Sequence, residues 1–414
     1  MFDILLADIN GVWRGLQAPP RDMEKLLGEG FSFPRSLYAM RFDGGLAEKT
    51  GLGIAAGDPD YPCVFLHPKP HPALWREGGM QAAAAMQTPE GAPFYADPRQ
   101  VLAETEAKLQ ADGFFPLLAA ELEFYLWEDN GGGFGNASGA PVSELYSPDA
   151  LSRRSGFFTL LGRAAEAQNI ELGARISEYS AEQFEINLRH KAPLDACLEA
   201  LLFRRLVREC ARASGLRATF LAKPRADGAG SGMHFHASMR DANGGYCFAD
   251  EKVLHAAVAG VLAVIGEGTA FFAPFGNSYR RFAPNIYAPL SACWGEENRN
   301  AAVRLPRAGS PAEKRFEFRA AGADANPYLA AAALLAGAHW GMSRGLRPPP
   351  PMRRGTRIPP TWHAALEGMR RAKILPRYIS PQFLRLYLEV KASELHRENA
   401  HITDYDREHY GRVL

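Results

Sequence analysis

The spacing of apolar and polar residues predicts strands and helices that follow one another along most of the chain. Period-two alternation or short continuous apolar runs, which indicate strands, occur in five stretches. These are FDILLADI from Phe2, FPLLAAELEFYLWE from Phe115, EQFEINLR from Glu182, GMHFHASMRD from Gly232 and KRFEFRA from Lys314. The pattern therefore predicts strands in both halves of the chain.

Helical spacing fills the segments between these strands. A short helix in RDMEKLLGEG ends at a glycine, and an Asp-Pro pair at 97–98 begins a longer one. Further helices are expected at 152–169, 194–215, 253–266, 325–341 and 380–398. This mixture of elements predicts an α+β protein.

The strand-rich beginning of the chain differs from the helix-rich remainder. We place a domain boundary near Tyr95, which gives an amino-terminal domain at 1–95 and a larger domain at 96–414. The stretch GGGFGNASGAP from Gly131 lacks the Lys-Ser/Thr of a P-loop and is interpreted as a flexible linker.

Composition limits the possible partners. Lys and Arg total 47 and Asp and Glu total 46 among 414 residues, so the chain lacks the basic excess that binding to nucleic acid or an anionic membrane requires. Five cysteines without a CxxC pair favour a reducing compartment, and we expect a cytoplasmic protein. Asp3 and Asp8 interrupt the first apolar run, which excludes a signal peptide there. The apolar runs HAAVAGVLAVIG and YLAAAALLAGAHW are too short to span a bilayer, so we interpret them as buried helices.

Acidic residues and histidines recur at a spacing of two on the predicted strands. Residues two apart on a strand share a face, so Glu121 lies beside Glu123 and His234 beside His236. Taken singly, each pair has an ordinary interpretation as the solvated face of an edge strand. A Glu–Arg pair such as Glu317 and Arg319 is most often a structural contact.

Together these pairs indicate a metal site. Carboxylates that face the same way repel one another unless a cation lies between them. Glutamate oxygens and imidazoles without a thiolate favour Mg²⁺ or Mn²⁺. The stretch from Asn277 to Pro306 adds four arginines, Arg280, Arg281, Arg299 and Arg304. Divalent ions beside arginines are typical of phosphoryl transfer.

Five motifs in one order carry a family resemblance. They are ELEF, EYSAEQFEIN, GSGMHFHAS, NSYRRFAP with WGEENRNAAVRLP, and KRFEFRA with ANPYL. In these motifs the chain resembles the glutamine synthetase superfamily along nearly its whole length. The resemblance implies an amino-terminal β-grasp domain and a catalytic α/β domain with a curved antiparallel sheet. It also implies a homo-oligomer, usually a dodecamer of two hexameric rings, with active sites between neighbouring subunits.

The resemblance also implies roles for the acidic and histidine residues. It assigns to a first metal ion the ligands Glu123, Glu178 and Glu185. It assigns to a second ion, which bridges the phosphates of ATP, the ligands Glu121, His234 and Glu317.

Further roles follow from the same motifs. Residues matching positions that contact ATP are His236, Ser238, Arg304 and Arg315. Residues matching those that neutralise the transferring phosphate are Arg299, Arg304, Arg315 and Arg319. Residues matching the surroundings of the glutamate substrate are Arg281, Gly230, Gly232 and Arg304. Asp43 matches an aspartate that a neighbouring subunit contributes to deprotonate the nitrogen nucleophile.

Tyr287 departs from glutamine synthetases that use ammonia, which carry a glutamate at this position. Ala229 likewise replaces an asparagine near the amino-acid substrate. Both changes, and the opening LADINGVWRG with FPRS, resemble the branch that joins glutamate to organic amines, typified by γ-glutamylpolyamine synthetase. We therefore expect an ATP-dependent ligase for glutamate and a small amine. The alternatives are a glutamine synthetase and a non-catalytic assembly protein of the same fold.

The sequence does not identify the amine. A polyamine would need acidic groups for its distal ammonium, and Glu296 and Glu297 are candidates because they are close to Tyr287 in the sequence.

Overall fold

The amino-terminal part forms a six-stranded sheet. The computed structural model describes residues 1–128, 144–284, 287–411 and 413. The strands of this sheet are β1 (Phe2–Ala7), β2 (Trp13–Ala18), β3 (Phe31–Pro34), β4 (Asp60–Phe65), β5 (His71–Pro72) and β6 (Met80–Met86). Their order is β2-β1-β6-β4-β3, with β5 on β6, and β1 pairs in parallel with β6. Every residue of β1 is buried, including Asp3, which explains why the rest of the strand is apolar.

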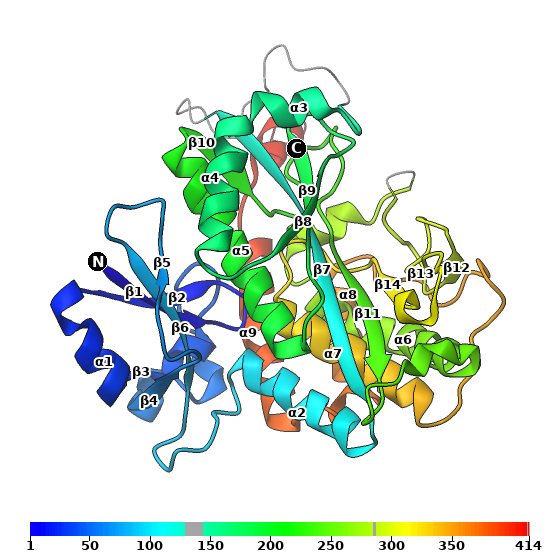
Figure 1. Cartoon of the computed structure of the whole chain (residues 1–414), viewed down its shortest axis with the longest axis horizontal. Coiled ribbons are helices and arrows are strands. Elements are labelled where there is room, and N and C mark those ends of the chain that lie inside the picture. The colour runs from blue at the N-terminus through cyan, green and yellow to red at the C-terminus, as the bar shows by residue number, and fades with distance from the viewer. Residues whose placement is uncertain (129–143, 285–286, 412, 414) are drawn as a thin grey trace.

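A larger, curled sheet of eight strands crosses the rest of the molecule (Figure 1). Its strands are β7 (Phe115–Glu128), β8 (Leu172–Ser177), β9 (Gln183–Leu188), β10 (Leu216–Thr219), β11 (Met233–Arg240), β12 (Trp294–Glu296), β13 (Val303–Leu305) and β14 (Phe316–Phe318). Their order is β12-β13-β14-β11-β7-β9-β8, with β10 on β7. All pairings except that of β12 with β13 are antiparallel, as expected from the sequence.

β7 carries the alternation that orients the site. Its residues Leu118, Ala120, Leu122 and Phe124 are buried in the hydrophobic core. The intervening residues therefore point to the opposite face of the sheet.

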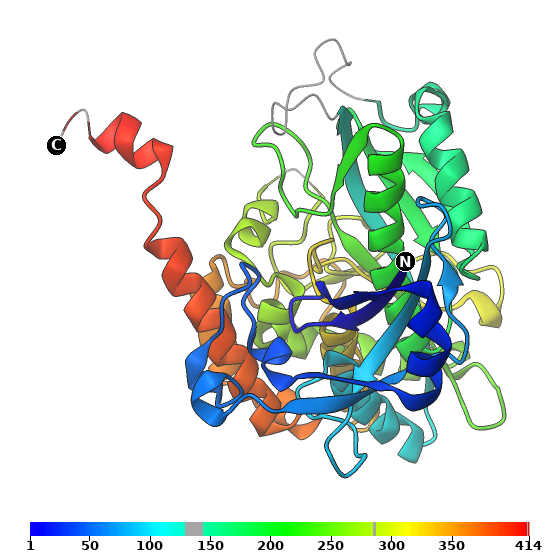
Figure 2. The same ribbon diagram turned by 90° about the vertical axis from the view of Figure 1, so that its left-hand side faces the viewer.

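Helices pack around and between the two sheets. They are α1 (Met23–Glu29), α2 (Pro98–Ala111), α3 (Pro148–Arg153), α4 (Ser155–Glu166), α5 (Pro193–Ala213), α6 (Glu251–Phe272), α7 (Pro327–Met342), α8 (Trp362–Arg370) and α9 (Pro381–Asn399). α6 and α7 approach closely, because a Cβ atom on Gly260 would lie only 2.0 Å from the carbonyl oxygen of Gly337. Figure 2 shows the chain after α9 extending away from the remainder of the molecule.

Two sequence predictions about helices need correction. The helix expected at 152–169 is two helices, because Arg154 leaves helical geometry between α3 and α4. The apolar run expected at 253–266 belongs to the longer α6, which is long and apolar enough to cross a membrane. Within the structure α6 packs against α7 and α8 and is mostly buried, which agrees with the expected core helix.

The division of the chain at residues 95 and 96 remains a prediction. The residues on either side of it lie in the connection between β6 and α2, whose Asp97 cap accepts a hydrogen bond from the amide of Arg99. The linker predicted from Gly131 lies outside the described residues.

Candidate active site

Strand register brings the predicted acidic residues and histidines together. Glu121 of β7 is opposite His234 of β11, and on its other side it is opposite Asn187 of β9. Glu123 is opposite Glu185 in the same ladder, and His236 is opposite Glu317 of β14. Four strands that are far apart in the sequence thus present these groups on one face of the sheet.

A cavity of about 500 Å³ lies over this face. The predicted site residues that line it are Glu121, Glu123, Glu178, Glu185, Gly230, His234, Arg281, Tyr287, Arg299, Arg304, Glu317 and Arg319. Glu178 comes from the loop after β8, as expected, and Tyr287 lies at the cavity with 59% of its surface exposed. The structure therefore gathers the predicted metal ligands and most of the predicted arginines in one place.

His234 lies at the centre of the acidic residues. Its Nδ1 atom is 3.7 Å from both Oε2 of Glu121 and Oε1 of Glu317, and its Nε2 atom is 3.7 Å from Oε1 of Glu123. These separations are too long for hydrogen bonds. Nδ1 is buried and has no hydrogen-bond partner among the described residues.

Burial opposes the ionisation of three of the glutamates, Glu178, Glu185 and Glu123. It raises the pKa of Glu185 well above its usual value, and the charge of Glu121 adds to this effect. Burial, together with the charge of Glu178, raises the pKa of Glu123 to about 7. Like charges in a buried site are costly, so this arrangement favours a cation.

The pKa of the buried His234 imidazole shifts in the opposite direction. Burial, with the positive charge of Arg319, lowers the pKa of His234 to about 4, so its ring is neutral at pH 7. Burial alone would raise the pKa of Glu121, but the contacts of this carboxylate with His234 and His236 outweigh burial and lower its pKa. Oε1 of Glu121 is 2.9 Å from Nε2 of His236.

These residues fit divalent metal ions. Ligand atoms of Glu121, Glu185 and His234 lie within 4.8 Å of one another, and so do those of Glu121, His236 and Glu317. The set offers carboxylate oxygens and imidazole nitrogens, which suit Mg²⁺ or Mn²⁺. The unpaired Nδ1 atom of His234 provides a lone pair that such an ion would use.

Arginines lie beside this acidic set; Arg281 and Arg319 are buried, and Arg304 is half-buried. Arg319 and Arg304 both donate hydrogen bonds to the carboxylate of Glu317. Arg281 is only 4% exposed, and it donates to the backbone carbonyls of Ala320 at 3.1 Å and Arg319 at 2.9 Å. Those carbonyls carry no net charge, so the Arg281 guanidinium remains available to an anion.

Two glycines permit this close packing. A Cβ atom on Gly230 would lie 2.7 Å from Cγ of Arg281 and 2.9 Å from the carbonyl oxygen of Ala222. A Cβ atom on Gly232 would lie 2.7 Å from Nε2 of His234. Larger side chains at these positions would displace the arginine or the histidine.

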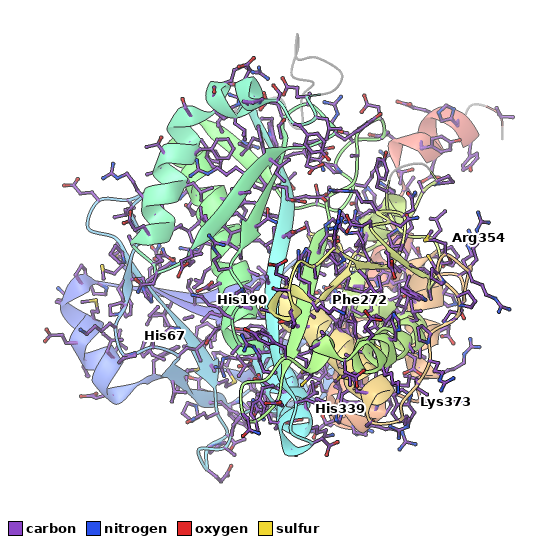
Figure 3. The ribbon with its side chains drawn as sticks, turned by 45° about the vertical axis from the view of Figure 1, so that its right-hand side comes forward. His67, His190, Phe272, His339, Arg354 and Lys373 are labelled. Carbon is purple, nitrogen blue, oxygen red and sulfur yellow. The ribbon has the colours of Figure 1, made fainter. Side chains whose placement is uncertain are left out.

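A second cavity of about 380 Å³ borders the first. It is lined by His236, Ser238 and Arg315, three of the four residues that the sequence associates with ATP; the fourth, Arg304, lines the first cavity, and Glu121 lines both. The Nε atom of Arg315 donates a 3.1 Å hydrogen bond to Nδ1 of His236. His190 also borders this cavity and is labelled near the centre of Figure 3.

Three predicted residues lie elsewhere. Asp43 does not line either cavity of its own chain among the described residues; it pairs with Arg397 of α9 at 2.8 Å. Glu296 and Glu297 are exposed and do not line either cavity, so the structure does not support them as the groups that hold a distal ammonium.

The sequence reading missed several residues at the cavity. Asn187 donates a hydrogen bond to Glu121, and it could have been found because it follows Glu185 by two positions on the same strand. Tyr146, Tyr179 and Asp227 also line the cavity, but they lie in loops whose positions no period predicts.

Comparisons with known proteins agree with this geometry. A family model described as the catalytic domain of glutamine synthetase matches residues 95–410. The chain belongs to the glutamine synthetase family.

Named members of the glutamine synthetase family match almost the whole chain. Gamma-glutamylputrescine synthetase PuuA of Escherichia coli (strain K12) is 36% identical over 432 residues, which cover 98% of this chain and 90% of that protein. Glutamate–isopropylamine ligase of a Pseudomonas species is 29% identical and covers 98% of this chain and 94% of that protein. A solved GmaS/ADP complex shares the fold, with a TM-score of 0.86, 24% identity and coverage of 98% of this chain and 95% of that chain.

Proposed function

We propose that the protein is an ATP-dependent ligase that joins the γ-carboxylate of glutamate to an organic amine. The observation that carries this proposal is one cavity lined by five glutamates, the buried imidazole of His234 and four arginines, of which Arg281 and Arg319 are buried. Relatives named as a gamma-glutamylputrescine synthetase and a glutamate–isopropylamine ligase support the choice of an amine as the second substrate.

The proposed metal ligands fall into two groups that share no residue. Glu123, Glu178 and Glu185 would hold one divalent ion, and Glu121, His234 and Glu317 would hold another. When bound, the ions would neutralise phosphate charge and orient the phosphates. His236, Ser238 and Arg315 would contact ATP in the adjoining cavity, which shares Glu121 with the first.

The reaction would proceed in two displacements. A γ-carboxylate oxygen of glutamate attacks the γ-phosphorus of ATP, and the bond from phosphorus to the β–γ bridging oxygen breaks to release ADP. The amine nitrogen then attacks the acyl carbon of γ-glutamyl phosphate, and phosphate leaves with the electrons of the carbon–oxygen bond. One proton leaves the nitrogen, and a carboxylate, proposed to be Asp43 of a neighbouring subunit, accepts it.

The arginines and glycines would position the reacting groups. Arg281, whose guanidinium donates to backbone carbonyls among the described residues, would hold the glutamate carboxylate beside Gly230 and Gly232. Arg299, Arg304 and Arg319 would neutralise the charge on the phosphate during transfer.

The assembly and the amino-terminal fold belong to the same proposal. Asp43 lies away from its own cavity, so the scheme requires a homo-oligomer, and we propose the family's paired hexameric rings. The parallel β1–β6 pair beside the β1–β2 hairpin supports a β-grasp assignment for residues 1–95.

Glutamine synthesis from ammonia is the second candidate function. Tyr287 argues against it, because a half-exposed aromatic side chain at the cavity offers apolar surface and no negative charge. A non-catalytic assembly protein is a third candidate, and the complete set of proposed ligands argues against that possibility.

The test is phosphate release from ATP with glutamate and a panel of primary amines and ammonium, with product masses determined. The proposal expects a γ-glutamyl amide with at least one amine, formed faster than glutamine at equal concentration. Formation of glutamine alone would favour the second candidate. Absence of phosphate release with every nitrogen source would favour the third.

A further inference from the structure

The outer part of the cavity is unusually rich in exposed tyrosines. We call this part the mouth and define it by Leu145, Tyr146, Tyr179, Asp227 and Tyr287, all of which line the cavity. The three tyrosines are 61%, 56% and 59% exposed in that order, and Leu145 is 41% exposed. Exposed apolar surface gathered at one opening indicates a site for an apolar group.

Asp227 is the acidic residue of the mouth, and its charge is already paired. Nε of Arg225 donates to Oδ1 of Asp227 at 3.1 Å, and Nη2 donates to Oδ2 at 3.0 Å. The hydrogen bond and charge of Arg225 lower the pKa of Asp227, so both groups stay ionised at neutral pH. The other carboxylates among the described lining residues belong to the proposed metal set, which is Glu121, Glu123, Glu178, Glu185 and Glu317.

The turn that contains this pair is anchored to the sheet. The hydroxyl of Tyr125 on β7 donates to the carbonyl oxygen of Ala229 at 2.8 Å, and the amide of Ala229 donates to Oγ of Ser180 at 2.7 Å. A Cβ atom on Gly228 would lie 2.9 Å from the Tyr125 hydroxyl oxygen. The turn therefore fixes Arg225 and Asp227 close together beside the opening.

We infer that Arg225 determines amine specificity by neutralising Asp227, so that the mouth favours a monoamine with an apolar body over a diamine. The inference rests on the function proposed above. A second ammonium at the exposed mouth is attracted only by an anion whose charge is not already compensated. The Arg225 guanidinium occupies that anion and repels the incoming charge. An alkyl body instead gains contact with the tyrosine rings and Leu145.

The inference can be tested with two amines that differ only at the far end. Butylamine and 1,4-diaminobutane have the same four-carbon body, and only the second carries a distal ammonium. We expect kcat/KM for butylamine to exceed that for 1,4-diaminobutane by at least about tenfold. This ratio corresponds to a difference of about 1.4 kcal/mol in transition-state binding. The ratio is measured on one preparation, so it does not depend on the fraction of active enzyme.

Variants then assign the effect to Arg225. Arg225→Ala should lower the ratio at least about fivefold by improving use of the diamine, since Asp227 is then unpaired. Arg225→Lys keeps the positive charge and should retain most of the preference. Adding Asp227→Asn to Arg225→Ala should remove the improvement in kcat/KM for 1,4-diaminobutane. If Arg225→Ala does not fold, Arg225→Gln serves the same purpose.

Three outcomes would overturn the inference. Equal or better use of 1,4-diaminobutane by the unmodified protein would contradict the monoamine preference, although the proposed function would stand. An unchanged ratio in Arg225→Ala would remove Arg225 as its cause. Turnover of ammonium with no turnover of either amine would reject the proposed function, and this inference with it.

Discussion

At the scale of residues, the site consists of buried charges that depend on one another. Arg319 is 5% exposed; it pairs with Glu317, and its Nε atom donates to the carbonyl oxygen of Arg299 at 3.1 Å. The same guanidinium is proposed to neutralise the transferring phosphate. Removing its charge would leave the buried Glu317 carboxylate with one arginine partner, Arg304, among the described residues, so an informative substitution keeps a positive charge.

Arg319→Lys satisfies that condition, because lysine keeps the charge and loses the planar fork. We expect kcat to fall at least about tenfold and KM for glutamate to change less than about threefold, because the lost contact is strongest in the transition state. Phosphate release at saturating ATP measures both constants. Arg307→Lys, at an exposed position that does not line either cavity, is the control. A raised KM with unchanged kcat would contradict the role.

Tyr287 is the residue that separates the two leading functions. Its side chain offers apolar area, and each buried CH₂ of an alkylamine contributes about 0.8 kcal/mol. We expect Tyr287→Glu to narrow or reverse the preference for butylamine over ammonium, measured as the ratio of kcat/KM values. Tyr287→Phe keeps the ring and should keep the preference. If Tyr287→Glu leaves the ratio unchanged, Tyr287 has only a packing role.

At the scale of elements, the large sheet positions the proposed metal ligands, and the turns position the residues proposed to bind glutamate. The alternation along β7 places Glu121 and Glu123 on one face with a buried apolar set on the other. The turn leading into β11 carries Gly230, which packs directly against Arg281. Strand pairing therefore determines where the proposed metal ligands lie, while a glycine contact determines where Arg281, the proposed glutamate-binding residue, lies.

Gly230→Ala tests that contact. The added methyl would collide with Cγ of Arg281 and the Ala222 carbonyl oxygen, so we expect KM for glutamate to rise at least about tenfold, the size of a single lost charged contact. The matched control is Gly266→Ala in α6, where an added Cβ atom meets nothing within 4 Å. An unchanged KM in Gly230→Ala would show that Arg281 is not held by this packing or does not bind glutamate.

The sequence predicted the strands and helices better than it predicted the breaks between helices and the contacts made by loops. β7 was predicted with its observed bounds, because an alternating run of this length has no competing helical interpretation. The break at Arg154 was missed, since α3 and α4 together keep helical spacing. The Arg225–Asp227 pair and the mouth were also missed, because loop geometry depends on anchors such as Tyr125 and Ser180 that only the fold brings near.

At the scale of the whole molecule, two long-range arrangements lie beyond the sequence pattern. The loop of Asp43 is held by α9, where the carboxylate of Glu394 accepts a 2.7 Å hydrogen bond from the amide of Phe42. The two residues are 352 positions apart, and the local spacing of apolar residues cannot predict such a contact. The predicted subunit arrangement likewise depends on surfaces between chains.

Metal binding should stabilise the whole protein. A ligand that binds only the folded state stabilises it by RT ln(1 + [L]/Kd), so we expect Mg²⁺ to raise the midpoint of thermal unfolding. Glu185→Gln should reduce this rise. It should not lower the metal-free midpoint, because burial already favours the neutral form of Glu185. Differential scanning fluorimetry with EDTA and with Mg²⁺ measures both values. A Glu185→Gln variant that keeps the full rise would exclude Glu185 as a ligand.

The central claim is that one cavity couples ATP cleavage to the joining of glutamate and an amine through divalent ions. Its most direct test is phosphate release with ATP, glutamate and butylamine, combined with the mass of the product. The account predicts release together with γ-glutamylbutylamide, complete loss of both in excess EDTA and recovery of both when Mg²⁺ or Mn²⁺ is restored. Release that persists in excess EDTA, or release without an amide product, would contradict it.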